Sequence, residues 1–502
     1  MLYNPTLTCD TLVIGGGTAG AAIAGRLAAR ASETVVLLEA GPDYGRLADG
    51  QWPRDLVDGR VVATASHDWQ YASAAVHGVP QHRLERARVL GGCSAHNGCI
   101  AIWGSRVDYD GWAALGNPGW STAELLPYFQ QANAMLRVRQ FAAAEITPFH
   151  AACLDAMQQS GLPLVADLNN FDEDIGVSSA PVNIAGDVRW NTAFAYLDPV
   201  RDQPHLTVLG HTLVDKLQIA QGKVVGVEVL GAQGRQTLVP GRVILCAGAY
   251  GSPALLLRSG IGPAAELRAL GIQPLLDLPG VGRNLHDHPA IYLQYDASAQ
   301  LDAAMNAFVA AGHTLFTEQS LAKVKSEQCT TAFDLHFYPC SNPLPDANGH
   351  WAFVWPVANM SPQSRGSVRL RSADPAVAPL IDTGYVTDPD DRDVDVLRSG
   401  MARARQLMQQ AGLTERLGRE TADSQQIGER ASVRRACLHY YHPVGSCKMG
   451  PDRDPLAVVN ARGQLYGLEN LYVGDASIMP VIPRANTNLP ALVVAERMAA
   501  WL

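Results

Sequence analysis

Short apolar runs, each closed by a glycine or a polar residue, mark the first forty positions of the chain. Cys9 to Ile14 predicts a buried strand, and Thr34 to Leu38 predicts a second one. Between them, Ala21 to Arg30 is alanine-rich and amphipathic, which predicts a helix. Two apolar strands joined through a helix form a βαβ unit, so we expect a parallel sheet at this end of the chain.

Hydrophobic patterns along the rest of the chain predict further helices and strands. Ala113 to Leu136 predicts a helix, with Ser121 and Glu124 as a capping box. Alternation from His211 to Val239 predicts a β-meander. Further predicted elements are strands at 243–245, 333–337, 351–355, 367–371 and 471–473, helices at 394–410 and 491–502, and a loop at 52–80. We therefore expect a parallel-sheet nucleotide domain built from separated segments, with an inserted antiparallel sheet that includes strands 333–337, 351–355 and 367–371.

Three glycines follow the first predicted strand at the spacing of a dinucleotide-binding turn. Gly15 permits the tight turn, Gly17 lets the backbone approach a pyrophosphate, and Gly20 lets the helix pack closely on the strand. The helix that follows offers unpaired N–H groups to phosphates. Glu39 ends the second strand, where an acid accepts hydrogen bonds from ribose hydroxyls and repels a 2′-phosphate. The pattern predicts a dinucleotide that contains ADP and disfavours NADP.

Composition restricts the class of protein but does not indicate which reaction it catalyses. The chain has 502 residues, which allows two or three domains, and its formal net charge is −9. An acidic balance argues against nucleic acid or an anionic membrane surface as partner. The sequence has no apolar run near the ~18 residues of a membrane span. Nine cysteines without a C-x-x-C pair favour reduced thiols, and we expect a cytoplasmic protein without a metal site.

Six motifs, in order along almost the whole chain, resemble the glucose–methanol–choline (GMC) oxidoreductase family. They are Gly15 to Gly20, Ala87 to Gly104, Gly248 to Gly262, Pro279 to Pro289, His439 to Gly450 and Val473 to Glu496. The resemblance implies an α/β fold with a Rossmann-like FAD-binding domain and an antiparallel-sheet substrate-binding domain. We place the first at 1–150, 191–288 and 436–502, and the second at 151–190 and 289–435. The implied reaction is hydride removal from a primary alcohol, which gives an aldehyde. Further oxidation of the aldehyde to an acid is left open.

The resemblance also implies the residues that hold FAD. They are Gly15, Gly17, Thr18, Ala19, Gly20, Glu39, Ala40, Arg88, Gly92, His96, Asn97, Gly98, Ala247, Gly248, Asp475, Ala476, Asn486 and Thr487. The stretch around His96 resembles choline oxidases, in which a histidine at this point is covalently attached to the flavin. We therefore expect His96 to carry such a link, with packing beside the flavin as the alternative.

Two residues near the C-terminus are the candidate catalytic groups. His442 lies in His439 to Gly450 and suits a base that takes the alcohol proton, because the usual histidine pKa lies near neutral pH. Asn486 matches the second active-site position of the family and would hold the substrate oxygen. Asn488 is the alternative for that role, and capping of the last helix is the structural alternative for both. His439 and the pair Asp287–His288 are expected to be structural.

The substrate is less determined than the reaction. A quaternary ammonium needs a carboxylate or an aromatic cage, and residues 311–316, where we expect one, hold no acid, although Glu318 is close. We therefore favour an aromatic or hydroxymethyl-bearing primary alcohol, with Arg484 and Tyr441 as candidate substrate contacts. Aromatic residues of the second sheet (Phe337, Trp351, Phe353, Trp355) are candidates for a pocket wall.

The covalent-link motif favours dioxygen as the acceptor. A dehydrogenase with another acceptor, a flavin-dependent lyase, a photodecarboxylase and a non-catalytic flavoprotein are the alternatives. We expect no nucleic acid and no membrane partner, and a homodimer is left open.

Overall fold

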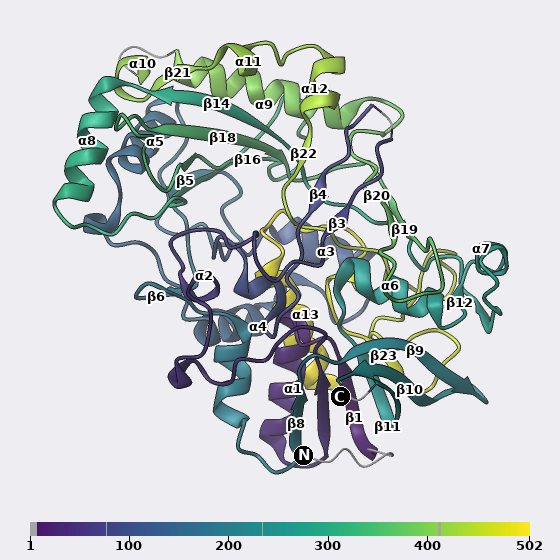
Figure 1. The fold of residues 1–502 in the computed structure, drawn as a ribbon. Helices are drawn as coiled ribbons and strands as arrows, with labels where there is room; N and C mark the ends of the chain where they lie inside the picture. The colour runs from purple at the N-terminus through teal and green to yellow at the C-terminus, as the bar shows by residue number, and fades with distance from the viewer. Residues whose placement is uncertain (1–7, 77, 233, 410–412) are drawn as a thin grey trace.

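The computed structural model describes residues 8–76, 78–232, 234–409 and 413–502, and its first layer is a seven-stranded sheet. Strands β8 (Leu206–Leu209), β2 (Val35–Leu38), β1 (Thr8–Ile14) and β11 (Gly234–Leu245) lie side by side in parallel, and β23 (Leu471–Val473) pairs with β11. Helix α1 (Thr18–Arg30) packs against α13 (Asn488–Trp501), which in turn packs on α4 (Thr122–Met135) (Figure 1). The predicted βαβ unit is confirmed.

Strand β11 joins two kinds of pairing. Its first half pairs antiparallel with β10 (Lys223–Gly231), which pairs with β9 (Leu213–Ala220), so the predicted meander is confirmed. Its second half enters the parallel sheet between β1 and β23. The predicted separate strand at 243–245 is therefore the end of one long strand, and α6 (Gly248–Arg258) follows it.

The second layer is an eight-stranded sheet. Its main path runs through β21 (Gly418–Glu420), β14 (Pro289–Ala297), β18 (Ala352–Asn359), β16 (Leu335–Phe337), β15 (Ser320–Val324) and β5 (Gly176–Ser179). Strands β17 (Cys340–Ser341) and β22 (Leu438–His439) pair with β18 and β14. Helices α5 (Pro148–Gln159), α8 (Ala299–Ala310) and α9 (Arg392–Met408) lie near it in Figure 1. All the pairs in this sheet are antiparallel.

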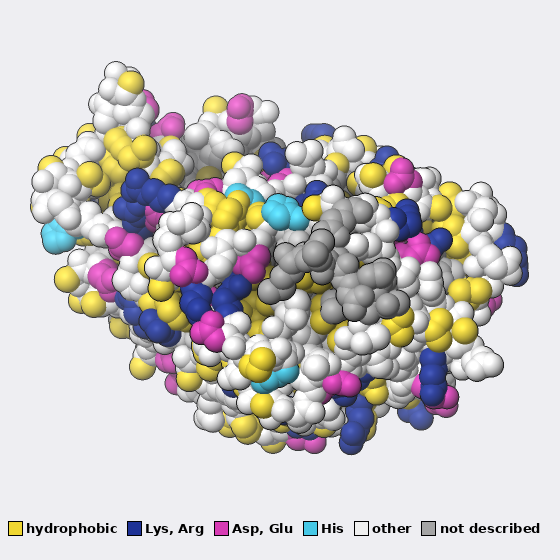
Figure 2. All heavy atoms as spheres, turned by 60° about the horizontal axis from the view of Figure 1, so that its bottom comes forward, with side chains coloured by type: hydrophobic (Ala, Val, Ile, Leu, Met, Phe, Trp, Pro, Cys, Tyr) yellow, Lys and Arg dark blue, Asp and Glu magenta, His cyan; other side chains and the backbone are white. Residues whose placement is uncertain are grey.

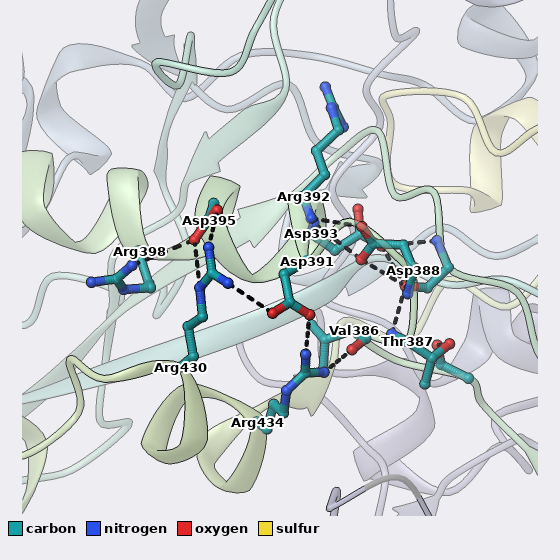
Figure 3. A network of polar contacts seen from close by, with 12 residues as sticks. Val386, Thr387, Asp388, Asp391, Arg392, Asp393, Asp395, Arg398, Arg430 and Arg434 are labelled. Carbon is teal, nitrogen blue, oxygen red and sulfur yellow. Dashed lines mark hydrogen bonds and ion pairs between the residues drawn. The ribbon is translucent and has the colours of Figure 1, made fainter.

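A network of ion pairs fixes the start of α9 (Figure 3). Arg430, in α12 (Arg430–Ala436), contacts Asp391 at 2.9 Å and Asp395 at 2.7 Å. The fully buried carboxylate of Asp393 accepts hydrogen bonds from the backbone N–H groups of residues 363 and 364. Acidic groups at a helix N-terminus also complement the helix dipole. The network therefore anchors α9 beside the second sheet.

Three predictions about elements were wrong in part. The predicted helix 113–136 is two helices, because α3 (Arg106–Ala114) ends before Gly116 and α4 begins after Ser121. The Ser121–Glu124 capping box is present. Strand β19 (Ser367–Arg369) pairs with β20 (Leu380–Asp382) in a separate two-stranded sheet instead of joining the large one. The last helix begins at Asn488, three residues before its predicted start at Ala491, since a proline such as Pro490 is tolerated in the first turn of a helix.

The aromatic residues proposed as a pocket wall lie on the other face of their sheet. Phe337, Trp351, Phe353 and Trp355 are buried in a hydrophobic core with residues of α9. Alternation along β18 sends Val354 and Pro356 to the opposite face instead, where they line a cavity.

On the face that Figure 2 shows, acidic and basic side chains are interspersed. Among the described helices, none is both long and apolar enough to cross a membrane.

Candidate active site

A cavity of about 790 Å³ runs from the glycine turn of the first sheet to the second sheet. It is lined by all the predicted cofactor residues except Gly20, and also by His442 and Tyr441. Residues from the N-terminal turn, the segment 85–100, α6 and the C-terminal loops thus meet around one space. The cavity brings together most of the site that the sequence predicted.

The glycine turn forms one end of this cavity. Helix α1 begins after Gly17 without a side-chain cap, and Gly15, Gly17 and Thr18 line the space in front of it. Uncapped N–H groups at a helix start fit a pyrophosphate. Gly20 faces the strand instead: a Cβ there would lie 1.8 Å from the carbonyl oxygen of Gly15. Its role is close helix–strand packing, as the spacing predicted.

Glu39 is tied to the turn by backbone hydrogen bonds. Its two carboxylate oxygens accept from the N–H groups of Gly16, at 2.9 Å, and Gly41, at 2.8 Å. Burial raises the pKa of Glu39 to about 7, and these bonds work in the opposite direction. Each carboxylate oxygen has a further lone pair, so the contact with a ribose remains a prediction.

The imidazole of His96 lines the cavity and is almost fully buried. Its Nε2 lies 2.5 Å from the carbonyl oxygen of Ser66, which fixes this nitrogen as the N–H donor of a neutral ring. Burial lowers the pKa of His96 to about 4, so the ring is neutral at physiological pH. A neutral ring with a free Nδ1 lone pair meets the chemical requirement for attack on an electrophilic methyl group.

His442 is held in a pair with a second buried histidine. Its Nδ1 lies 3.0 Å from Nδ1 of His288, and one of the two nitrogens must carry the proton between them. Burial lowers the pKa of His442 well below its usual value, and His288 and Arg86 lower it further. If Nδ1 of His442 carries the shared proton, its Nε2 has the free lone pair. His442 is therefore a neutral base at a cavity wall.

Asp287 connects the two histidines to the fold. Its Oδ1 accepts from the backbone N–H groups of His288, at 2.7 Å, and His442, at 2.8 Å. Its Oδ2 accepts from the hydroxyl of Tyr385 at 2.9 Å. Burial raises the pKa of Asp287 to about 6, although the charge of Arg86 favours the carboxylate. The expectation that Asp287 and His288 form only a capped turn is thus incomplete, since both contact the candidate base.

The two asparagines near the C-terminus have different partners. Oδ1 of Asn488 accepts from the hydroxyl of Thr18 at 2.8 Å, and Thr487 holds the N-cap position of α13. The buried Oδ1 of Asn486 has no hydrogen-bond partner among the described residues, and Asn486 lines the cavity. A buried amide without a partner is costly unless a ligand satisfies it. This favours Asn486 for contact with cofactor or substrate.

The segment just before β15 contributes an acid that the sequence places close to residues 311–316. Glu318 lines the cavity, and the hydroxyl of Tyr338 donates to its Oε2. A Cβ at Gly98 would lie 2.0 Å from the same carboxylate oxygen, so Glu318 lies against the loop that follows His96. Burial raises its pKa to about 7. Residues 311–316 hold no acid, but an acid lines the cavity two positions beyond them.

Tyrosine rings form the wall between Glu318 and His442. The ring of Tyr440 lies 4.9 Å from that of His442 and 6.2 Å from that of Tyr338, measured between centroids. Tyr292 and Tyr441 line the same cavity. An alcohol bound beside His442 would thus meet aromatic faces and one carboxyl group.

Arg484 is directed away from this cavity. Its guanidinium forms an ion pair with Asp108 and donates hydrogen bonds to the carbonyl oxygen of Phe333 and to the hydroxyl of Ser361. The residue does not line the cavity. Because its donors are used in joining distant segments, the predicted substrate contact is corrected to a structural role.

Several lining residues carried no readable sequence signal. Arg86 and Tyr338 come from segments far apart in the chain, and only folding places them around the same cavity as Glu318. Tyr440 stands two positions before His442, so the motif His439 to Gly450 is a signal that could have indicated it. Asp287, His288 and His442 also lie close enough to share a metal ion. Hydrogen bonds within the protein account for their arrangement.

Comparison with known proteins agrees with this geometry. The N-terminal GMC oxidoreductase family model matches residues 9–290, and the C-terminal one matches residues 362–495. The chain is 32% identical to an oxygen-dependent choline dehydrogenase of Photobacterium profundum, over 98% of this chain and 92% of the relative. It is 33% identical to a glucose dehydrogenase (FAD, quinone) of Drosophila pseudoobscura, over 99% and 87%. The crystal structure of pyridoxine 4-oxidase from "Mesorbium loti" superposes with a TM-score of 0.87 at 29% identity, over 98% of this chain and 99% of that one.

Proposed function

The chain belongs to the GMC oxidoreductase family and is an FAD-dependent oxidoreductase acting on CH–OH donors, and on this premise we propose that it oxidises a primary alcohol to an aldehyde with dioxygen as acceptor. One observation carries the proposal. A neutral buried histidine, His442, and Asn486, whose Oδ1 has no partner among the described residues, line the same cavity as the dinucleotide turn.

Different residues accept the proton and hold the substrate oxygen in this reaction. Bound FAD supplies the acceptor for the hydride of the carbinol carbon. Nε2 of His442 takes the hydroxyl proton, and Nδ1 keeps the ring oriented through His288. The amide N–H of Asn486 donates to the substrate oxygen as negative charge develops on it. Loss of one proton and one hydride converts R–CH₂–OH to R–CHO, and transfer of both electrons and two protons to dioxygen gives hydrogen peroxide.

The turn and loops suit FAD in further detail. We propose that α1 holds the pyrophosphate, that Asp475 and Ala476 lie along the ribityl chain and the flavin, and that His96 is covalently attached. The carboxylate of Asp475 is buried and accepts from the backbone N–H of Gly248 at 2.8 Å, which supports a rigid wall there. Acid precipitation of the holoenzyme should leave the yellow colour in the pellet. Colour that moves to the supernatant in wild type, as in His96→Ala, would contradict the link.

The wall of tyrosines and Glu318 supports two substrate types. An aromatic or hydroxymethyl-bearing alcohol suits the rings, and the pyridoxine 4-oxidase likeness agrees with it. An alcohol with a cationic nitrogen is the second candidate, because a carboxylate beside aromatic rings favours a cation. The choline dehydrogenase likeness agrees with that one.

An anaerobic screen tests the reaction and the acceptor together. Alcohols of both types are added to oxidised holoenzyme, and flavin absorbance is followed before and after admission of air. We expect bleaching by a primary alcohol, then rapid recovery with one peroxide per aldehyde. Recovery that needs a quinone or dye would indicate a dehydrogenase. Turnover without bleaching would indicate a lyase, and turnover only in light a photodecarboxylase.

We further propose the domain division at 1–150, 191–288 and 436–502 against 151–190 and 289–435, which the two separate sheets support except at β22, a strand of the second sheet. A cytoplasmic location is also proposed. All nine cysteines are free in the described chain, as expected in a reducing compartment.

A further inference from the structure

The peptide group that joins Tyr441 to His442 is bound at both of its polar atoms by charged side chains. Its carbonyl oxygen accepts from Nη1 of Arg86 at 3.0 Å. Its N–H donates to Oδ1 of Asp287 at 2.8 Å. In a trans peptide the C=O and N–H point in opposite directions, so the cation and the anion hold the group from opposite sides.

This peptide lies in a backbone conformation that needs such support. Tyr441 has φ of 67°, in the left-handed region that residues with a side chain rarely adopt. Strained positions persist where surrounding contacts over-determine them, and they cluster at functional sites. Here the strained residue directly precedes the candidate base, and Pro443 restricts the backbone on the other side. The direction of the His442 side chain thus depends on this peptide.

The same carboxylate oxygen serves the partner of the base. Oδ1 of Asp287 also accepts from the backbone N–H of His288, at 2.7 Å. One oxygen therefore holds the main chain of both imidazoles whose Nδ1 atoms lie 3.0 Å apart. Displacing that oxygen would change the position of the base and the position of its partner together.

We propose that Arg86 and Asp287 form a clamp on the Tyr441–His442 peptide and act as positioning residues that aim the imidazole of His442 into the cavity. Neither residue transfers a proton in this scheme. Arg86 binds the carbonyl oxygen and Asp287 binds the N–H. The hydroxyl of Tyr385 donates to the other carboxylate oxygen of Asp287 and so helps to fix it. The inference rests on His442 being the base of the proposed reaction.

Crystal structures of variants test the clamp without any substrate. In Asp287→Ala the 441–442 peptide should rotate, and the Nδ1 atoms of His442 and His288 should separate beyond hydrogen-bond distance. Asp287→Asn keeps an oxygen for both N–H groups and should preserve the peptide. Arg86→Met should release only the carbonyl side. An unchanged peptide and imidazole in Asp287→Ala would overturn the proposal, whatever the enzyme oxidises.

Anaerobic reduction of the flavin by a saturating alcohol supplies the kinetic measurement. Misplacement of a reacting group by about 1 Å costs roughly 100-fold in rate, so Asp287→Ala should lower the limiting reduction rate by about that factor. The apparent Kd of the alcohol should change little, because the ring wall and Glu318 are untouched. Asp287→Asn should recover most of the rate.

Asp302→Asn is the matched control. Asp302 is another buried acid, which accepts from the backbone N–H of Trp351 at 2.8 Å and lies outside the cavity lining. Its variant should match wild type in FAD content and rate. If Asp287→Ala does not retain FAD, Asp287→Asn and Arg86→Met decide the question. A wild-type rate and an unmoved peptide in Arg86→Met would then contradict the clamp, and a peptide whose carbonyl oxygen has moved while its N–H still donates to Asp287 would support it.

Discussion

The chemistry of single residues in this site is set by burial. An exposed histidine is partly protonated near neutral pH, whereas the buried ring of His442 has a pKa well below its usual value and remains a free base. Burial has the opposite sign for an acid, and it raises the pKa of Glu318 to about 7. The same physical cause thus prepares a base at one position and a titratable acid at the other.

Replacing the base should remove proton transfer and leave the cofactor in place. We expect His442→Ala to lower the limiting rate of flavin reduction by about 10²- to 10⁴-fold, the usual contribution of a general base. His439→Gln is the comparison, because His439 lies three positions earlier and does not line the cavity. Stopped-flow absorbance measures both. Equal losses in the two variants would argue against a specific role for His442.

Glu318 should give the enzyme a pH-dependent affinity for cationic alcohols. Its raised pKa means that the carboxylate forms only as pH rises through about 7, so KM for a cationic alcohol should fall between pH 6 and pH 8. Glu318→Gln should abolish this dependence and raise KM above pH 7 by roughly 10- to 100-fold, since a charge-assisted contact contributes roughly 1.5–3 kcal/mol. KM for an uncharged alcohol is the control. A cationic alcohol with the same KM in both proteins would contradict the role.

Among the elements, the start of α1 is the one that close packing controls most directly. Gly20 lies in its first turn against the glycine turn of β1, with no room for a side chain. By contrast, a Cβ at Gly111 in α3 would meet no atom within 4 Å. Two helical glycines therefore have opposite roles, one required by packing and one merely tolerated.

The pair Gly20→Ala and Gly111→Ala should change stability in opposite directions. Overpacking should make Gly20→Ala less stable by about 1–3 kcal/mol and displace α1, with loss of FAD. Alanine in an open helical position should make Gly111→Ala more stable by about 0.5–1 kcal/mol. Denaturant unfolding gives the free energies, and flavin absorbance gives the FAD content. Full FAD occupancy in Gly20→Ala would show that the contact is not needed.

At the scale of the whole molecule, the cavity lies between the two sheets. Residues of the glycine turn supply one end, and Glu318, Tyr338 and Tyr440 supply the other. A ligand that spans the cavity therefore contacts both layers at once, whereas a ligand that fills only the first end does not.

FAD should consequently make the two sheets unfold together, whereas ADP should not. A ligand present at 100 times its Kd adds about 2.7 kcal/mol to the free energy of unfolding. We expect FAD to raise the thermal midpoint of apo-His96→Ala in a single transition. At the same multiple of its Kd, ADP should leave the second sheet to unfold separately and earlier. The His96→Ala variant keeps a covalent link from confusing the comparison. Identical single transitions with FAD and ADP would contradict this coupling.

Local sequence was sufficient for the elements and the glycine turn because their causes are local. Apolar spacing determines β1, α1 and the meander, and the family resemblance of the motif around His442 predicts the candidate base. The predictions of side-chain direction and strand pairing failed where residues distant in the sequence determine them. Phe353 and Trp355 point into the core under α9, and β19 pairs outside the large sheet. Arg484 likewise has Asp108 as a partner 376 positions away.

The sequence alone thus determined the fold class, the dinucleotide turn and the candidate base, since each depends on residue type and short-range spacing. Only the tertiary structure decided that Glu318 lines the cavity, that Oδ1 of Asn486 has no partner among the described residues, and that Arg86 and Asp287 hold one peptide. These facts depend on segments hundreds of residues apart that meet in a cavity. Burial and hydrogen-bond partners, which set their chemistry, do not exist before the chain folds.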